Sequence, residues 1–366
     1  MSKSCATTPT VGRNNERLAM KNELWRLARK PPHGWPEPED FRWCEESVPE
    51  PAVNQILTRT LYLSLDPYQW GRRRGGAELP GDVCHGRTVS QVVASRLSDY
   101  AEGDFVFNTN GWQQYGLSGE NIDVFGYMLP RKIDPDQAPI STAIGVMGML
   151  GLTAYSGLIL QCAPQPGETV VVSAASGGVG QVVAQLGRLY GCRVVAIAGS
   201  DKKLAYLKAL GVDTAVSHRS ENFADELTQA CPDGCDIYFE NVGGPVFDAV
   251  LPLLNPGARI SLCGLISQYG NVDGGDPRAQ WRERGAQTFE RQQVLVHDLF
   301  VGNFVADYQD RFLQEMGGYV RSGEVDYLED KRDGLELAPD VFAQMLRGDN
   351  FGKTLMVVSK DPTSEG

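Results

Sequence analysis

The stretch that decides the fold is residues 169–180, which read TVVVSAASGGVG. A short apolar strand runs into a glycine-rich turn, and an amphipathic helix follows directly. Glycines at such a turn let backbone N–H groups at the helix N-terminus approach a pyrophosphate, and the helix dipole opposes its charge. Against the GxGxxG pattern, Ala175 replaces the first glycine, while Gly177 and Gly180 keep the spacing of the other two. The stretch therefore predicts a dinucleotide-binding turn.

Strands and helices alternate after this turn, which is typical of a parallel sheet. We expect strands at Thr169–Ser173, Arg193–Ala198, Ala215–Val216, Cys235–Phe239, Ala258–Cys263 and around Leu299–Val305. We expect helices at Gly180–Tyr190, Lys202–Leu210, Phe223–Ala230 and Pro245–Leu254. The order predicts the fold class α/β, with a doubly wound parallel sheet of the Rossmann type.

The end of the second strand indicates which dinucleotide binds. NAD-binding proteins usually place Asp or Glu there to hold the ribose 2′-OH. This chain has Ser200 instead, followed by Asp201, Lys202 and Lys203. Cations near a 2′-phosphate favour NADP(H), although Asp201 argues the other way and the two lysines also suit a solvated helix face. The sequence thus predicts NADPH/NADP+ as the cofactor, with Ser200 and Lys203 as contacts.

The rest of the chain has a different pattern. Short strands at Gln55–Leu63, Thr88–Ser95, Asp104–Asn108 and Gly111–Leu117, broken by Pro and Gly, predict a small barrel or sandwich. The apolar segment Gly352–Val358 needs a sheet to join, and that first domain is its expected host. We therefore divide the chain into 1–137, a β-rich domain, 138–317, the nucleotide-binding domain, and 318–366, which returns to the first domain.

One segment has the length of a membrane span. Residues Ile140–Leu160 carry no charge, but glycines and hydroxyl side chains are interleaved among the apolar ones. That mixture suits a closely packed helix in a protein core, and a second span and interfacial anchors are missing. We expect no membrane association.

Composition excludes several partners. The 366 residues include 34 basic and 46 acidic side chains, which give a formal net charge of −12. Nucleic acids and anionic membranes are themselves polyanions, so we expect neither as a partner. Eight cysteines are too few for a disulfide scaffold, and the first twenty residues lack the apolar region of a signal peptide. These features predict a cytoplasmic protein that acts on small molecules.

Six motifs carry a family resemblance that spans nearly the whole chain. They are Leu63–Tyr68 (LSLDPY), Gly148–Tyr155 (GMLGLTAY), the AASGGVG turn, Phe239–Gly244 (FENVGG), Cys263–Tyr269 (CGLISQY) and Gly348–Lys353 (GDNFGK). In these motifs the chain resembles the zinc-independent medium-chain reductases of the prostaglandin reductase and leukotriene B4 12-hydroxydehydrogenase group. That group includes bacterial curcumin reductases and plant alkenal double-bond reductases. The resemblance implies a GroES-like β-rich catalytic domain beside a Rossmann domain, and a homodimer.

The resemblance also implies cofactor contacts. Phosphate contacts are expected at Gly177, Gly178, Val179 and Gly180, and a 2′-phosphate contact at Lys203. His218 and Arg219 stand where the family often has a tyrosine beside that phosphate, and either one can serve it or lie on an exposed turn. Contacts around the nicotinamide half are implied at Asn241, Cys263, Gly264, Leu265, Ile266, Ser267, Phe300, Val301, Gly302 and Asn350.

The metal ligands of zinc-dependent relatives are not apparent. Only Cys231 and Cys235 lie close together among the cysteines, and the neighbours Cys84 and His85 would point to opposite faces of a strand. We predict no metal site. Without zinc as a Lewis acid, alcohol dehydrogenase chemistry is disfavoured, and reduction of an activated C=C bond in an enone or enal is favoured.

That reaction places negative charge on a carbonyl oxygen and requires a proton at the α-carbon. A neutral tyrosine, with an ordinary pKa of about 10, can donate a hydrogen bond to the oxygen and a proton to the carbon. Tyr269 is our first candidate and Tyr68 our second. Two alternatives stay open at this point: an NADPH quinone oxidoreductase, and a non-catalytic NADPH-binding protein.

The substrate itself is less well indicated. Asn271–Gln293 reads as a polar lid, and its arginines either recognise an anion or lie on a solvated helix. Trp112 and Trp281 either line a pocket or pack in a core. The four arginines are Arg278, Arg282, Arg284 and Arg291.

Overall fold

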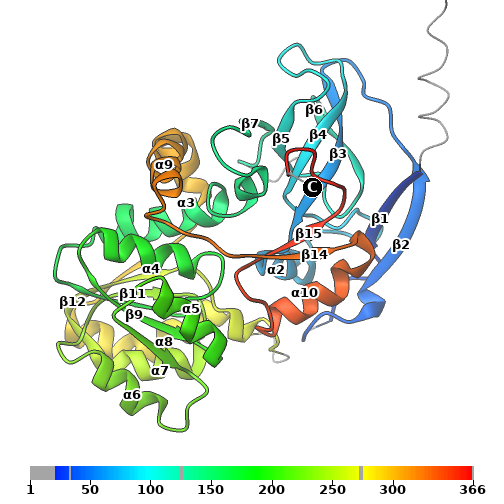
Figure 1. Cartoon of the computed structure of the whole chain (residues 1–366). Coiled ribbons are helices and arrows are strands. Elements are labelled where there is room, and N and C mark those ends of the chain that lie inside the picture. The colour runs from blue at the N-terminus through cyan, green and yellow to red at the C-terminus, as the bar shows by residue number, and fades with distance from the viewer. Residues whose placement is uncertain (1–20, 33, 124–126, 272–274, 365–366) are drawn as a thin grey trace, which may run out of the picture.

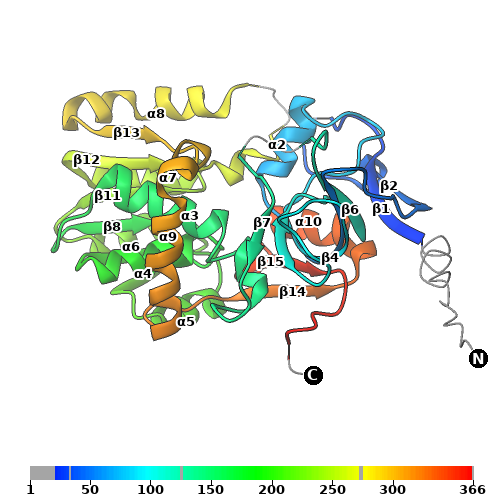
Figure 2. The ribbon, with the colours of Figure 1, turned by 90° about the horizontal axis from the view of Figure 1, so that it is seen from above.

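Two large β-sheets lie side by side in the described part of the chain, one parallel and one mostly antiparallel (Figure 1). The computed structural model describes residues 21–32, 34–123, 127–271 and 275–364. Figure 2 shows helix α2 (Tyr68–Gly75) at the junction between the two sheets. Because α2 begins with Tyr68, the junction is where the candidate chemistry is to be sought.

The parallel sheet has six strands in the order β10-β9-β8-β11-β12-β13. This is the doubly wound order of a Rossmann fold, since strands β9 and β11 flank the first strand, β8. The three valines that precede the glycine-rich turn are fully buried, as expected for a strand with helices on both faces. The strands are β8 (Thr169–Val172), β9 (Arg193–Ala198), β10 (Thr214–Ser217), β11 (Cys235–Glu240), β12 (Leu254–Leu262) and β13 (Leu295–Asp298).

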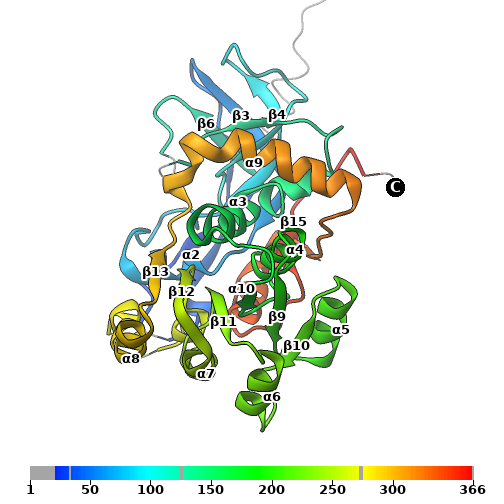
Figure 3. The same ribbon diagram turned by 90° about the vertical axis from the view of Figure 1, so that its left-hand side faces the viewer.

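Two separate apolar cores cover the faces of this sheet. One face packs against α3 (Met149–Tyr155), α4 (Gly180–Leu189), α5 (Asp201–Ala209) and α9 (Gly302–Ser322). The other face packs against α6 (Phe223–Ala230), α7 (Gly244–Val250) and α8 (Pro277–Gln292). Figure 3 shows the two groups of helices on either side of the strands. The α/β fold class is therefore confirmed.

The second sheet has the order β14-β15-β3-β4-β5-β7, with β6 also paired to β3. Strand β15, at the C-terminal end, pairs antiparallel with β3, so the predicted return of this segment to the first sheet is confirmed. The strands are β3 (Gln55–Ser64), β4 (Thr88–Ser95), β5 (Phe105–Asn108), β6 (Tyr115–Gly119), β7 (Arg131–Ile133), β14 (Glu329–Asp333) and β15 (Lys353–Val357). A further hairpin joins β1 (Lys21–Leu27) to β2 (Phe41–Ser47).

A buried arginine anchors α2 to the β-rich part. The Arg73 guanidinium lies 4.4 Å from the centre of the Trp112 ring and 5.0 Å from that of Phe342, which belongs to α10 (Ala338–Leu346). Its charge is paired with Glu78 at 3.2 Å. Desolvated cation–π contacts of this kind stabilise one orientation of the arginine side chain. They therefore hold α2 in a fixed position against the β-rich part of the protein.

Two sequence predictions about elements are wrong. Residues Ile140–Leu160 do not form one helix: a 3₁₀ turn (Ile140–Ile144), α3 and a π-helical segment (Ser156–Cys162) follow one another. Gly145 and Gly148 have non-helical backbone angles and separate the 3₁₀ turn from α3, whereas α3 continues directly into the π-helical segment; a Cβ at Gly148 would lie 2.2 Å from the Ala143 carbonyl oxygen. In the described residues, no helix is both long and apolar enough to cross a bilayer.

The predicted strand at Leu299–Val305 is also displaced. The edge strand β13 ends at Asp298, and Gly302 already begins the long helix α9. Apolar residues of α9 pack this helix against the sheet, and Phe312, in the middle of α9, is almost fully buried. The alternation of apolar residues there reflects helix packing, which the sequence pattern did not distinguish from a strand.

Candidate functional site

Five turns converge on the carboxyl edge of the parallel sheet. In an open α/β fold this edge, where strand order reverses, is where ligands bind. Most of the predicted cofactor contacts lie on these turns, although they are far apart in the chain; His218 and Arg219 follow β10, and Asn350 precedes β15. The turns follow β8 (Gly177, Gly178, Val179, Gly180), β9 (Ser200, Lys203), β11 (Asn241), β12 (Cys263, Gly264, Leu265, Ile266, Ser267) and β13 (Phe300, Val301, Gly302).

The glycine-rich turn is packed too closely for side chains. A Cβ at Gly178 would lie 2.2 Å from Leu150 Cδ2, and one at Gly180 would lie 2.4 Å from the Ala174 carbonyl oxygen. The N-terminus of α4 begins at Gly180, so the positive end of its dipole faces this turn. The bare backbone and the helix end fit a pyrophosphate.

The returning C-terminal chain holds this helix in place. Gln181 Oε1 accepts from the Leu328 N–H at 2.9 Å, and Gln185 Oε1 accepts from the Asp326 N–H at 2.7 Å. Gly177 forms an isolated parallel bridge with Gly352. The phosphate turn is therefore clamped between the two parts of the chain.

Three basic side chains gather where an NAD-binding protein has its acidic residue. A Cβ at Gly199 would lie 2.7 Å from His218 Nε2 and 3.2 Å from Arg219 Nε. Partial burial and the nearby Arg219 charge lower the pKa of both Lys203 and His218. His218 is thus neutral at pH 7, and a phosphate among these groups would relieve the repulsion between the Lys203 and Arg219 charges.

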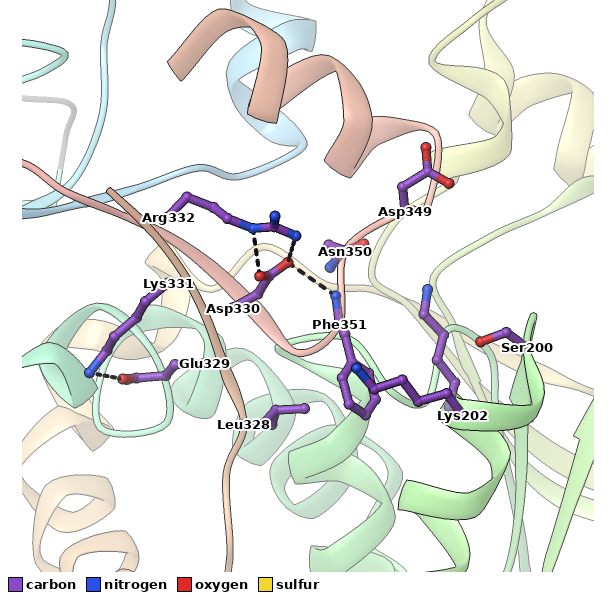
Figure 4. Close-up of a pocket in the computed structure, with 11 residues that line it drawn as sticks. Ser200, Lys202, Leu328, Glu329, Asp330, Lys331, Arg332, Asp349, Asn350 and Phe351 are labelled. Atoms are coloured by element: carbon purple, nitrogen blue, oxygen red, sulfur yellow. Dashed lines mark hydrogen bonds and ion pairs between the residues drawn. The ribbon is translucent and has the colours of Figure 1, made fainter. Parts of the chain in front are cut away.

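A cleft of about 470 Å³ opens beside these cations, between α5 and the returning chain (Figure 4). Ser200, Lys203 and Asn350 all line it. Lys203 Nζ donates to the Gly348 carbonyl at 2.7 Å, so it already bridges the cleft. Figure 4 shows Lys331 and Arg332 turned toward the carboxylates of Glu329 and Asp330, their ion-pair partners, so these two cations are neutralised locally.

A buried carboxylate organises the turn after β11. Glu240 Oε1 accepts from the N–H groups of Val242 and Gly243 at 2.8 and 3.0 Å, and Glu240 Oε2 accepts from the Trp281 indole at 3.0 Å. Its neighbour Asn241 donates from Nδ2 to the Ser173 carbonyl at 2.8 Å. Asn241 is therefore fixed beside the phosphate turn.

The turns after β12 and β13 differ in exposure. Leu265 is buried against the sheet, whereas the Ser267 hydroxyl donates back to the Val242 carbonyl at 2.6 Å. Phe300 is 51% exposed and meets the Tyr127 ring edge-on, with 5.7 Å between ring centres. This aromatic pair, with Phe300 exposed and Tyr127 partly buried, offers an apolar wall to a ligand.

Both candidate tyrosines are associated with helix α2 at the junction. A Cβ at Gly71 would lie 3.6 Å from Tyr269 Cε1, so the Tyr269 ring lies directly against α2. Tyr68 lies one turn earlier on this helix, and residues three apart share a helix face. Burial raises the pKa of both phenols, so each keeps its proton at neutral pH. Helix α2 thus carries one neutral phenol, that of Tyr68, and is contacted by a second, that of Tyr269.

A buried cluster of charged side chains that we did not predict, formed by Asp66, Arg87 and Lys353, lies beside Tyr68. Asp66 Oδ1 is 3.0 Å from Lys353 Nζ and Asp66 Oδ2 is 2.8 Å from Arg87, and all three side chains are buried. The Ser64 hydroxyl donates to Asp66 Oδ2 at 2.6 Å. Burial opposes ionisation of Asp66, but the two cations and this hydrogen bond hold its pKa below the ordinary value. In the sequence, the only indication of this cluster was that Asp66 belongs to the LSLDPY motif and Lys353 to the GDNFGK motif.

His85 also has a role that the sequence did not indicate. We considered it only with Cys84 as a metal pair, but Cys84 is buried while His85 Nε2 lies 2.8 Å from the Tyr68 hydroxyl. In the described part of the chain, no group of three or more His, Cys, Asp or Glu side chains is arranged to hold a metal ion.

The predicted polar lid is largely a packed helix. Residues 272–274 lie outside the described residues, but α8 covers one face of the parallel sheet with Trp281 stacked on Phe247 at 4.4 Å. Arg278 and Arg282 both pair with Asp298, and Arg284 pairs with Asp248. These pairs favour the solvated-helix interpretation, and the burial of Trp112 and Trp281 favours core packing for both.

Comparisons with known proteins agree with this architecture. A family model described as the N-terminal domain of oxidoreductase matches residues 23–123, and one described as zinc-binding dehydrogenase matches residues 178–308. The chain is 42% identical to an NADPH-dependent curcumin reductase of Escherichia coli, over 93% of this chain and 98% of that one. It is 36% identical to an NADP(+)-dependent 2-alkenal reductase of Nicotiana tabacum, over 95% and 98%.

A solved structure is similar as well. CurA from Vibrio vulnificus in complex with NADPH superposes with a TM-score of 0.83 at 39% identity, covering 93% of this chain and 100% of that one.

Proposed function

Because the chain belongs to the medium-chain dehydrogenase/reductase family, we propose that it reduces the C=C bond of α,β-unsaturated ketones and aldehydes with NADPH. The observation that carries this proposal is the meeting of Tyr269 with α2 one turn from Tyr68, at the carboxyl edge of the sheet. Two neutral phenols there suit a substrate whose carbonyl oxygen gains negative charge during the reaction.

The cofactor would lie along the carboxyl edge of the sheet. Gly177, Gly178, Val179 and Gly180 would hold its pyrophosphate, and Lys203 and Arg219 its 2′-phosphate. Ser200 and His218 would flank that phosphate. The nicotinamide half would reach the turns after β11, β12 and β13. Asn350, which the resemblance assigned to the nicotinamide half, instead lines the cleft of Ser200 and Lys203 and would lie on the 2′-phosphate side.

When bound, NADPH supplies the hydride that adds to the β-carbon of the substrate. Tyr269 and Tyr68 act on the other end of the conjugated system: one donates a hydrogen bond to the carbonyl oxygen, and a phenol proton is delivered to the α-carbon. Phe300 and Tyr127 form an apolar wall that excludes water from the conjugated chain. Each of these roles needs a protonated tyrosine, which the buried setting favours.

We propose that the reaction proceeds without zinc. The residues that would polarise the substrate are tyrosines, and the Cys84 thiol is buried away from His85. A metal analysis of the purified protein tests this directly: about one zinc per chain would contradict it.

We further propose a cytoplasmic homodimer built from three chain segments, 1–137, 138–317 and 318–366. The division is supported by the two sheets, since the last segment supplies β14 and β15 to the sheet of the first. The dimer is supported by β13, an edge strand of the parallel sheet with exposed Leu295, because unpaired strand edges readily pair with a second copy. Light scattering on the purified protein would reveal a monomer if this is wrong.

The proposed activity is tested by following NADPH oxidation against a panel of enones, alkenals, quinones and saturated aldehydes. Mass spectrometry of the products identifies the bond that is reduced. We expect saturated ketones and aldehydes from the enones and enals. Preferential turnover of quinones would instead support a quinone oxidoreductase, and NADPH binding without turnover of any compound would support a non-catalytic binding protein.

A further inference from the structure

The hydroxyl of Tyr68 is directed at one side chain. Tyr68 Oη lies 2.8 Å from His85 Nε2, a full-strength hydrogen bond, and the two rings meet edge-on with 5.8 Å between their centres. His85 lies in the segment before β4, two residues before Arg87. Arg87 contacts the Tyr68 ring and also pairs with Asp66, so it connects Tyr68 to the cluster of Asp66 and Lys353. The phenol is thus surrounded by fixed groups.

The His85 imidazole is held in place by its own backbone. The His85 N–H donates to Glu78 Oε2 at 3.1 Å, and its carbonyl accepts from Arg73 at 3.3 Å. Glu78 and Arg73 are buried and paired with each other. A residue fixed on both sides of its backbone can hold a ring in one orientation.

The charge state of His85 follows from its surroundings. Burial, together with the positive charges of Arg72, Arg73 and Arg87, lowers the pKa of His85 to about 3, and the more distant Asp66 opposes this only weakly. The imidazole is therefore neutral at physiological pH, with one ring nitrogen a donor and the other an acceptor. A neutral ring can donate to Tyr68 without adding another positive charge.

Burial, and to a lesser extent the Asp66 charge, raises the pKa of Tyr68 and so disfavours its phenolate, and the positive charge of Arg87 is the main effect that opposes this. The Arg87 guanidinium lies 5.3 Å from the centre of the Tyr68 ring, and Arg87 itself is buried and paired with Asp66. A phenolate at Tyr68 would feel this fixed positive charge in a site of low dielectric. A second N–H donor at 2.8 Å would stabilise the phenolate oxygen further.

We propose that His85 is a positioning residue for Tyr68: its Nε2–H donates to the phenol oxygen, so that the phenol proton points toward the substrate. The inference rests on the proposed function. In the proton-transfer step the O–H bond of Tyr68 breaks and a C–H bond forms at the substrate α-carbon, whose electron pair accepts the proton. The phenolate is held by His85 and Arg87 until water returns a proton to it. No electron transfer occurs in this step.

The test compares three substitutions with the unchanged protein: Tyr68→Phe, His85→Leu and His85→Gln. Leucine removes the N–H donor, whereas the glutamine amide can place an N–H near the former Nε2 position. The measurements are kcat with an enone, the solvent deuterium isotope effect on kcat, and the dissociation constant of NADPH. His297→Leu, a histidine change in the edge strand β13, is the matched control.

We expect His85→Leu to lower kcat roughly ten- to hundredfold, the value of a hydrogen bond to a charged group. The solvent isotope effect should rise, because protonation becomes slower, while NADPH affinity stays unchanged. His85→Gln should recover most of the lost rate. The double variant Tyr68→Phe, His85→Leu should be no slower than Tyr68→Phe alone, since the two residues act as a unit.

The measurements distinguish a failure of the inference about His85 from a failure of the proposed function. If Tyr68→Phe impairs turnover but His85→Leu does not, the role of His85 is overturned while the proposed function stands. If Tyr68→Phe also leaves kcat unchanged, Tyr68 has no part in the reaction and the inference falls with it. If His85→Leu does not fold, His85→Asn takes its place, because it keeps a polar side chain but is too short to reach Tyr68. Full activity of that variant would also overturn the inference.

Discussion

Lys353 and Asp66 form a buried ion pair at 3.0 Å although 287 residues separate them in the chain. The Lys353 amine also donates to the Leu65 carbonyl at 2.7 Å, and its stem passes within 3.3 Å of where a Cβ on Gly178 would lie. The pair therefore connects the phosphate turn of the parallel sheet to the segment that carries Tyr68.

Replacement of Lys353 by methionine should destabilise the fold strongly. The Asp66 carboxylate would stay buried beside Arg87 but lose its second cation, and breaking one partner of a buried pair costs about 3–5 kcal/mol. Urea unfolding measures the change. Lys132→Met is the matched control: it breaks the exposed pair with Asp104, which should cost less than about 1 kcal/mol. Equal losses in the two variants would contradict the buried-pair interpretation.

The same carboxylate predicts a dependence of stability on pH. The pKa of Asp66 is depressed in the folded protein, so its contribution is fully present above the unfolded pKa of about 3.9 and is lost as the pH falls through the folded value. The difference in unfolding free energy between the natural protein and Asp66→Asn should be constant from pH 5 to 7 and shrink below about pH 4. A difference that persists unchanged down to the lowest accessible pH would show that folding does not depress the pKa of Asp66.

Arg219 should distinguish NADPH from NADH. Its guanidinium lies beside Gly199, and its charge acts on Lys203 at the end of β9, where Ser200 replaces the usual acidic residue of NAD-binding proteins. Arg219→Ala should weaken NADPH binding by about tenfold or more, the value of a charge-assisted hydrogen bond, and leave NADH binding nearly unchanged. Fluorescence titration with both cofactors gives the two constants. Equal weakening of both would mean that Arg219 does not contact the 2′-phosphate.

Lys203→Ala is a separate test, because Lys203 also bridges the cleft to Gly348. We expect it to weaken NADPH binding far more than NADH binding. Lys203→Met, which keeps the stem but not the charge, separates loss of the phosphate contact from loss of packing. If the methionine variant binds NADPH normally, packing rather than charge is the role of this residue.

Tyr269→Phe should reduce turnover of an enone with little effect on the cofactor. The phenol donates to developing negative charge, and loss of such a donor or general acid lowers kcat by about 10²-fold. NADPH affinity should be unchanged, because the ring lies against α2 rather than at the phosphate turn. Unchanged turnover in steady-state kinetics would remove Tyr269 from the mechanism.

The sequence predicted the nucleotide-binding part well because its signals are local. A glycine-rich turn between a β-branched strand and an amphipathic helix needs only neighbouring residues to be recognised, and the predicted strands Arg193–Ala198 and Thr88–Ser95 agree with β9 and β4. The predictions failed where the same apolar composition suits two structures. The non-helical backbone of Gly145 and Gly148 interrupts the helix expected there, and apolar residues around Val301 belong to α9 rather than to a strand.

The sequence by itself thus determined most of the order of strands and helices, the phosphate turn and the presence of Ser200 where NAD-binding proteins usually have an acidic residue, since each depends on residues close together in the chain. Tertiary structure alone decided which distant side chains meet. Pairing of β15 with β3 brings Lys353 to Asp66, and the packing of α2 beside the segment before β4 brings Tyr68 to His85. Such contacts depend on sheet pairing and on buried charge compensation across the whole fold, and no pattern within a short stretch of sequence encodes them.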